Sequence, residues 1–269
     1  MPSPEAASVP DSEPHHHRQA AESFGSDPER YDRARPRYPN ALIERILAGA
    51  PGRLVLDVGV GTGIVARQFQ AAGCTVLGVE PDARMAEFAQ RSGVDVEVSP
   101  FEAWEAAGRR FDAVVSGESW HWVDPVAGAA KAAEVLGPGG RLAVFWLTGQ
   151  PSGGLDEAFA EVYRRALPES LVTRLGTKSM EEAHSAMCAK AADGMRAPGL
   201  FDEPEQWRFE WTKSYTRDEW LDALGTSGAV IPQRQLTDLL AGIGEAIDAV
   251  GGDFTMNYVT FVVTAVRRP

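Results

Sequence analysis

The chain has 269 residues, of which 44% are hydrophobic and 24% are charged, and its formal net charge is -12. These values are typical of a globular enzyme with one large α/β domain, or with a core domain that carries an insertion. The acidic balance argues against a nucleic-acid partner, because phosphate binding needs clustered positive charge and no run of Lys or Arg supplies it.

The expected location is the cytoplasm. No segment approaches about 20 continuous apolar residues, and the N-terminus lacks the pattern of a signal peptide, so no membrane partner is expected. The two cysteines, Cys74 and Cys188, lack metal-type spacing and fit a reducing compartment. The three histidines at residues 15–17 have no carboxylate or thiolate partners nearby, so no metal site is expected.

Residues 1–18 are rich in Pro, Ser, Glu and Ala, which predicts a disordered tail. From Pro39 onward, helical and strand patterns alternate, which predicts a parallel sheet with crossover helices. Helices are expected over residues 40–47 (capped by Asn40), 63–72, 82–91, 101–107 and 125–136. Strands are expected over residues 53–58, 75–80, 94–98, 111–116 and, after a glycine-rich turn at 137–140, over 141–147.

The stretch from about 150 to 203 is helix-rich and breaks this rhythm, so we interpret residues 150–203 as a helical insertion or lid that forms part of the acceptor site. A strand is then expected over 207–215, followed by a helix that begins with a capping box at Thr216 and Glu219. A longer helix follows Pro232, and a β-branched strand ends the chain. Residues 19–149 and 204–269 are thus expected to form the core, with an N-terminal helical cap.

The most specific pattern is the segment 55–63. It places Asp57 at a strand end, followed by Gly59, Gly61 and Gly63 and then a helix. Glycines permit a sharp turn and a close approach of a ligand to the main chain, and the helix N-terminus offers N–H groups to an acceptor. The dinucleotide fingerprint would require a third glycine where this chain has Ile64. We expect Asp57 to cap the N–H groups of the glycine loop.

Glu80 provides a second anchor, because it ends the next strand 21 residues after Gly59. A carboxylate at this position can accept both hydrogen bonds from a ribose diol. The alternative is a solvated loop acid. Together, the glycine loop and Glu80 predict a nucleoside-binding site.

Residues from about 24 to the C-terminus resemble the class I S-adenosylmethionine-dependent methyltransferases, in particular the small-molecule branch (methyltransferase type 11, trans-aconitate-like). The resemblance is carried by four sequence blocks in the same order and by one segment before them. The matching segments are Asp57-Val-Gly-Val-Gly-Thr-Gly, Gly78-Val-Glu-Pro-Asp with Met85, Pro100-Phe-Glu-Ala-Trp, residues 111–124 and, before them, residues 31–39. The resemblance implies a Rossmann-like, seven-stranded, mostly parallel sheet with flanking helices. Its last strand would be antiparallel, between the fifth and sixth, and the helical insertion would follow strand five.

The resemblance also implies S-adenosyl-L-methionine as the cofactor, with contacts at matching positions. Gly59, Val60, Gly61 and Gly63 would pass under the methionine part, whose carboxylate Tyr31 and Arg35 would reach, and Glu80 would hold the ribose hydroxyls. Pro81 and Met85 would pack on the adenine face, and Phe101 and Glu102 would lie at the edge of the ring. Ser116 and Gly117 would offer carbonyls to the adenine amino group. Ser99 stands where the family commonly has Asp, which removes one expected adenine contact.

Methyl transfer from a sulfonium is an in-line displacement that requires alignment, exclusion of water and, for some acceptors, removal of a proton. His121 is the candidate base because its ordinary pKa is near about 6.5; the alternative is a histidine that orients the loop. The candidate walls of the acceptor pocket are Trp120, Trp122 and Trp146, and His184 is a further candidate. An anionic acceptor would require inward-facing cations among Arg164, Arg165, Arg174 and Lys178.

The expected acceptor is a small molecule, and the pattern leaves its reacting atom (O, N or C) and the oligomeric state open. Three alternatives are an NAD(P)-dependent oxidoreductase, a cofactor-binding protein of this fold that does not transfer methyl, and an enzyme that uses the sulfonium for another reaction. Ile64 and the strong final strand disfavour the oxidoreductase.

Overall fold

The computed structural model describes residues 25–168, 171–226 and 231–269, so the predicted tail over residues 1–18, with its three histidines, lies outside the described residues. Within them the chain forms a seven-stranded sheet in the order β3-β2-β1-β4-β5-β7-β6. The strands are β1 (Leu54–Val58), β2 (Thr75–Glu80), β3 (Asp95–Val98), β4 (Phe111–Gly117), β5 (Leu136–Pro151), β6 (Glu205–Thr216) and β7 (Asp253–Val266). β1 to β5 pair in parallel, and β7 runs antiparallel between β5 and β6, so the predicted fold class is confirmed.

The helices are α1 (Pro28–Ala34), α2 (Asn40–Ala48), α3 (Ile64–Ala71), α4 (Ala83–Arg91), α5 (Pro125–Val135), α6 (Leu155–Ala166), α7 (Leu171–Arg196), α8 (Arg217–Leu224) and α9 (Gln233–Asp248), with short 3-10 turns η3 (Phe101–Ala103) and η4 (Trp120–Trp122). None of the described helices combines the length and hydropathy that a membrane span requires. The capping box predicted at Thr216 and Glu219 is present at the start of α8.

Alternation along the central strands distributes their side chains between two hydrophobic layers. Leu56 and Val114 join the core on one side of the sheet, which includes residues of α5 and α7, and Val55 and Val115 join the core on the other side, which includes residues of α2, α3 and α4. Strands buried on both faces read as continuous apolar runs, which is why β1 and β4 were predictable from sequence.

Three local predictions were wrong. Asn40 is the first residue of α2 rather than its cap, since Pro39 occupies the cap position without a side-chain hydrogen bond. The helix predicted over 101–107 is only the turn η3, because the backbone is already extended at Trp104, with a ψ of 135°. The predicted turn at 137–140 lies inside β5, where Leu136 pairs with Phe111 and the Gly139 N–H bonds to the Arg267 carbonyl.

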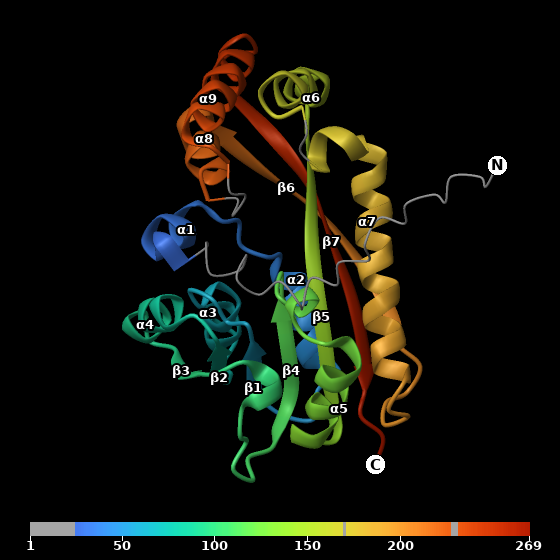
Figure 1. Ribbon diagram of the computed structural model, residues 1–269. Helices are drawn as coiled ribbons and strands as arrows, with labels where there is room; N and C mark the ends of the chain where they lie inside the picture. Colours follow the sequence, from blue (N-terminus) through green and yellow to red (C-terminus); the bar gives the residue numbers. More distant parts are fainter. Residues whose placement is uncertain (1–24, 169–170, 227–230) are drawn as a thin grey trace, which may run out of the picture.

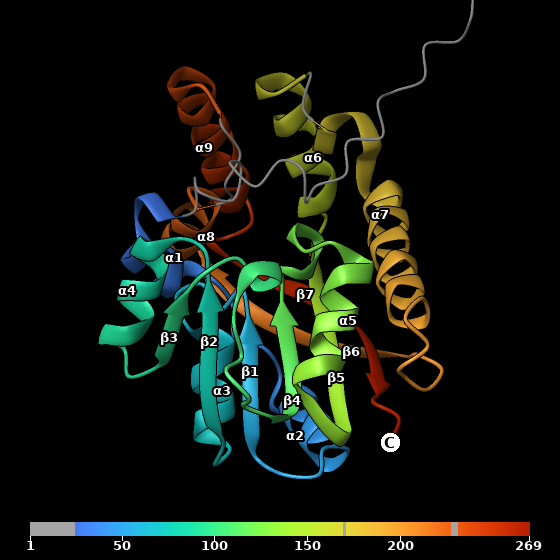
Figure 2. The ribbon, with the colours of Figure 1, turned by 60° about the horizontal axis from the view of Figure 1, so that its bottom comes forward.

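The ends of β5, β6 and β7 extend beyond the parallel strands and carry a third hydrophobic cluster with α6, α8 and α9. Figures 1 and 2 show α1, α6, α8 and α9 beyond the carboxyl ends of the parallel strands. α7 follows α6 and packs along α5, β5 and β7, and its residues Ala191, Ala192 and Met195 join the central core. The separation of residues 150–203 as a lid stays a prediction.

Candidate functional site

A cavity of about 620 Å³ lies at the carboxyl ends of β1, β2 and β4, the edge where open α/β sheets bind ligands. Most of the residues predicted for the cofactor and acceptor sites line this one cavity. They are Tyr31, Arg35, Gly59, Val60, Gly61, Glu80, Pro81, Met85, Phe101, Glu102, Gly117, His121 and Trp122.

The glycine loop turns through left-handed backbone conformations, with φ of 68° at Gly59 and 56° at Gly61. Such angles strain residues that carry a Cβ. A Cβ added to Gly59 would lie 2.5 Å from the Cβ of Ser119, whereas a Cβ added to Gly61 would meet nothing within 4 Å. Gly59 therefore permits close packing of β1 against the segment after β4, and Gly61 presents bare backbone at the cavity wall.

Glu80 supports the loop and faces the cavity. One carboxylate oxygen accepts the N–H of Gly61 at 2.8 Å, and the other accepts the N–H of Asp82 at 3.0 Å. Burial raises the pKa of Glu80 to about 7, although the two backbone bonds favour its charged form. Each oxygen keeps a lone pair for a second donor, as a ribose diol contact requires.

Asp57 is 1% exposed and lines the same cavity. The prediction that it caps the glycine loop was wrong, because the N–H groups of Gly59 and Val60 bond to the Val79 carbonyl, while Asp57 accepts the N–H of Ala66 in the first turn of α3. Burial, and then the charge of Glu80, raise its pKa well above the ordinary value. Its Oδ2 has no hydrogen-bond partner, so a buried acceptor remains for a donor on a ligand.

The segment after β4 contributes a carboxylate that sequence reasoning did not assign. Glu118 has a φ of 57°, lines the cavity, and accepts the backbone N–H of Leu147. Burial raises its pKa, and the Leu147 bond and the charges of His184 and Arg35 oppose that rise. The available signal was its position directly after strand β4, at the ligand-binding edge.

His121 lines the cavity, and its Nδ1 accepts a hydrogen bond of 3.2 Å from the indole N–H of Trp146. Burial, and then the charge of His184, lower the pKa of His121 to about 4. The ring is therefore neutral at pH 7, and because Nδ1 accepts a bond, Nε2 carries the proton. In this tautomer the ring donates a hydrogen bond from Nε2.

Five predicted site residues lie outside the lining of the cavity, and the geometry gives their predicted ligand contacts no support. His184 is buried, and its ring lies 6.0 Å from that of Phe261. Gly63 is the N-cap of α3. The Ser116 hydroxyl is buried and lies 2.5 Å from that of Ser119. Trp120 packs against Phe101 in the core, and Trp146 is 1% exposed beneath His121.

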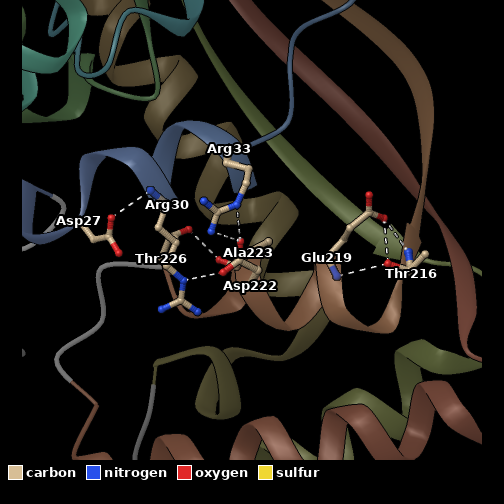
Figure 3. Close-up of polar contacts among 8 residues, drawn as sticks. All are labelled: Asp27, Arg30, Arg33, Thr216, Glu219, Asp222, Ala223 and Thr226. Atoms are coloured by element: carbon tan, nitrogen blue, oxygen red, sulfur yellow. Dashed lines mark hydrogen bonds and ion pairs between the residues drawn. The ribbon is translucent and has the colours of Figure 1, made fainter. Parts of the chain in front are cut away.

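The segment around α1 closes one side of the cavity. Arg35 donates to the carbonyl of Thr226 at 2.6 Å, and its buried Nε has no partner. Arg30 and Arg33 both pair with Asp222 of α8, at 2.7 and 2.9 Å, which holds α1 against α8 (Figure 3). The N-terminal cap predicted from the sequence therefore supplies one guanidinium that remains able to bind an anionic group.

The cations predicted for an anionic acceptor do not gather at this cavity. Arg164 pairs with Glu161 on α6, and Arg165 lies in a separate cleft against α9. The side chains of Arg174 and Lys178 lie outside the described residues. Among the Arg and Lys side chains that the structure describes, Arg35 alone lines the cavity.

Comparison with known proteins identifies the architecture. Residues 56–144 match the methyltransferase domain family. These residues form a methyltransferase domain. An uncharacterized methyltransferase from Mycobacterium tuberculosis is 35% identical over 146 residues, which are 53% of this chain and 59% of the relative. A ubiquinone biosynthesis O-methyltransferase from Dinoroseobacter shibae is 33% identical over 109 residues, 37% of this chain and 43% of the relative.

Among solved structures, a protein assigned as a type II methyltransferase from Anaeromyxobacter dehalogenans is 25% identical and superimposes with a TM-score of 0.65, covering 87% of this chain and 97% of that one. The methyltransferase domain has the class I fold, for which the sequence predicts S-adenosylmethionine as the cofactor. The oxidoreductase alternative is not favoured. The match spans 59% of the length of the Mycobacterium relative.

The described residues fit this cofactor. S-adenosylmethionine carries a sulfonium, an ammonium, a carboxylate and a ribose diol. The cavity offers the unpartnered Oδ2 of Asp57 and the carboxylate of Glu80 for donors and cations, and the unpartnered Nε of Arg35 for a carboxylate. The bare backbone at Gly61 leaves room for close approach.

Proposed function

We propose that this protein transfers the methyl group of S-adenosylmethionine to a small-molecule acceptor. The observation that carries the proposal is one cavity lined at once by the glycine loop, by Glu80 and by the segment after β4. A cavity of about 620 Å³ has the size of small-molecule sites. The Dinoroseobacter relative is named for ubiquinone biosynthesis, which supports a small-molecule acceptor.

We assign the cofactor contacts as follows. Glu80 holds the ribose hydroxyls, Asp57 accepts a donor through its Oδ2, and Tyr31 and Arg35 bind the methionine carboxylate. The adenine ring lies among the side chains of Pro81, Met85, Phe101 and Glu102 and the backbone of Gly117, all of which line the same cavity.

When bound, S-adenosylmethionine supplies a methyl group activated by a positively charged sulfur. The chain's own residues exclude water and hold the acceptor in line with that methyl. The carboxyl groups of Asp57, Glu80 and Glu118 line the cavity, and burial raises the pKa of each. Their ionised forms therefore gain more from a cationic ligand than from a neutral one.

His121 was predicted as a base, and the hydrogen bond that its Nδ1 accepts from Trp146 argues against that role. A base at Nε2 needs the other tautomer, in which Nδ1–H would face the indole N–H of Trp146. We therefore propose that His121 donates a hydrogen bond from Nε2 and positions the acceptor. On this proposal His121→Gln keeps part of the turnover and His121→Ala lowers it further, and both bind cofactor as the wild type does.

We place the acceptor on the side of the cavity bounded by α1, His121, Trp122 and Leu147. The stretch 150–203, none of whose described residues lines the cavity, stays our proposed lid. We also propose a cytoplasmic location, which the acidic composition and the free cysteines Cys74 and Cys188 support.

Calorimetric titration with S-adenosylmethionine, S-adenosylhomocysteine and NADH tests the cofactor assignment. We expect the first two to bind and NADH not to bind, and Glu80→Ala to weaken binding by roughly 1–3 kcal/mol through the loss of a charge-assisted hydrogen-bond partner. Incubation with methyl-labelled cofactor and a panel of acids, phenols and amines tests transfer. Tight binding without any labelled product would favour a cofactor-binding protein that does not transfer methyl.

A further inference from the structure

Glu118 combines backbone strain with a place at the ligand cavity. Two described non-glycine residues have positive φ, Ala107 and Glu118. Ala107 lies in an exposed loop beside Gly108, whereas Glu118 lines the cavity at the end of β4. A left-handed conformation is costly for a residue with a long side chain, and such strain gathers at functional sites. The strain at Glu118 directs a carboxylate into the cavity wall.

Three of the carboxylates that line the cavity, those of Asp57, Glu80 and Glu118, are engaged differently. Both oxygens of Glu80 accept backbone N–H groups, and Asp57 accepts the N–H of Ala66. Glu118 accepts one backbone N–H within the described residues, that of Leu147 in β5. A carboxylate has about four acceptor positions, so Glu118 retains capacity for a donor on a bound molecule.

The charged and titratable groups around Glu118 come from α1, from the segment that follows it and from α7. Arg35, which follows α1, and His184 on α7 favour its ionised form. The phenols of Tyr31 and Tyr38 also face it, and its charge opposes their ionisation. Glu118 therefore lies in the cavity wall close to one guanidinium, one imidazole and two phenols.

The lining also limits the charge of the acceptor. Besides Asp57, Glu80 and Glu118, the carboxyl groups of Asp82 and Glu102 line the cavity, and among the described side chains Arg35 is the one Arg or Lys there. The proposed cofactor assignment already uses Arg35 for the methionine carboxylate. An acceptor that brought a further negative charge would meet uncompensated like charge at low dielectric.

We propose that Glu118 is a catalytic residue that receives the proton of the methyl acceptor, and that the reacting group of the acceptor is an amine or a hydroxyl rather than a carboxylate. This inference rests on the proposed function. The acceptor N–H or O–H donates to a carboxylate oxygen of Glu118. The lone pair of the acceptor atom forms the bond to the methyl carbon, the electrons of the carbon–sulfur bond return to sulfur, and the acceptor's proton passes to Glu118.

The experiment compares the wild type with Glu118→Gln, in which the amide oxygen still accepts the Leu147 N–H but the proton acceptor is lost. Glu134→Gln, on the exposed side of α5, is the control for the loss of one negative charge. S-adenosylhomocysteine affinity is measured first. We expect Glu118→Gln and Glu134→Gln to stay within about threefold of the wild type, since a single cavity charge contributes modestly to a ligand that other groups hold.

The protein loaded with S-adenosylhomocysteine is then titrated with three probes that share one ring: benzylamine, phenol and benzoate. We expect the wild type and Glu134→Gln to bind benzylamine and phenol in preference to benzoate. Glu118→Gln should lose at least about tenfold in benzylamine affinity, the scale for a lost charged partner. With any amine or phenol that the wild type methylates, kcat of Glu118→Gln should fall by about 100-fold or more, and the acid limb of the pH profile should disappear.

Two results would overturn the inference on its own: preferential binding of benzoate, or fragment binding and turnover that are the same in Glu118→Gln and the wild type. Both leave cofactor binding intact. Failure of the wild type to bind S-adenosylhomocysteine would instead overturn the proposed function, and this inference with it. Glu118→Asp is a second test variant, because it keeps the carboxylate on a shorter side chain. Compared with Glu118→Gln, it should restore benzylamine binding more than turnover.

Discussion

Acidification should weaken cofactor binding through Glu80. Burial raises its pKa from the ordinary 4.5 to about 7, so folding disfavours its charge by about 3 kcal/mol. The sign follows from linkage: the folded chain binds this proton more tightly than the unfolded chain, so its stability falls as pH rises from about 4.5 to about 7. Ribose hydroxyls donate to the ionised carboxylate, so cofactor binding requires that same ionisation.

The magnitude follows from the fraction of ionised Glu80. With a pKa of about 7, that fraction falls about tenfold between about pH 8 and about pH 6, and the affinity for S-adenosylhomocysteine should fall by the same factor. Calorimetric titration across this range measures it. Glu80→Gln should bind more weakly at high pH, by roughly 1–3 kcal/mol, and with a flat profile, because one amide group cannot accept from both backbone donors.

Asp57 is the necessary control, since burial and Glu80 raise its pKa as well. Asp57→Asn should keep the slope between about pH 8 and about pH 6 if Glu80 is the titrating group. A wild-type affinity that is independent of pH, or a slope that survives in Glu80→Gln, would refute the reasoning.

Gly59→Ala should destabilise the fold by about 1–3 kcal/mol in thermal unfolding, because its φ is 68° and the new Cβ would clash with a serine side chain. Gly93→Ala is the control for the cost of positive φ alone, since its φ is 85° and a Cβ there would meet open space. If both variants lost the same stability, the clash would not contribute. Asp222→Asn breaks half-exposed ion pairs to α1, so the free energy of unfolding should fall by less than about 1 kcal/mol. Hydrogen exchange of the α1 amides should become faster, and unchanged exchange would mean that the pairs do not hold α1. Trp146→Phe removes the donor to Nδ1 of His121, and nitrogen NMR should then show both neutral tautomers of the ring. If the ring kept its proton on Nε2 alone, this hydrogen bond would not be what selects the tautomer.

Local rules explain which parts of the site were predictable. Left-handed turns need glycine, so Gly59 and Gly61 mark the loop directly, and Glu80 follows because it ends the next parallel strand. The carboxyl ends of parallel strands meet at one edge, so these separate signals predict one place. The seven-strand order came from family resemblance, since β7 pairs between β5 and β6 through residues as far apart as Arg141 and Val266.

The direction of side chains at strand ends was the part that sequence did not determine. Trp146 stands near the predicted edge, yet its side chain points into the protein, because side chains alternate along a strand and the register decides which face meets the cavity. Glu118 was missed for a related reason. Nothing in its residue type predicts a φ of 57°, and that angle places its side chain in the cavity wall.

The electrostatics of the cavity link stability to binding. Burial raises the pKa values of Asp57, Glu80 and Glu118, so the fold bears a cost for each charge that these groups carry at neutral pH. A ligand with a sulfonium and an ammonium lowers that cost, because positive charge nearby favours the ionised carboxylates. Binding should therefore stabilise the fold more at pH 8 than at pH 6, which is the reverse of the trend for the protein alone, and a cofactor analogue without positive charge should lose most of that difference.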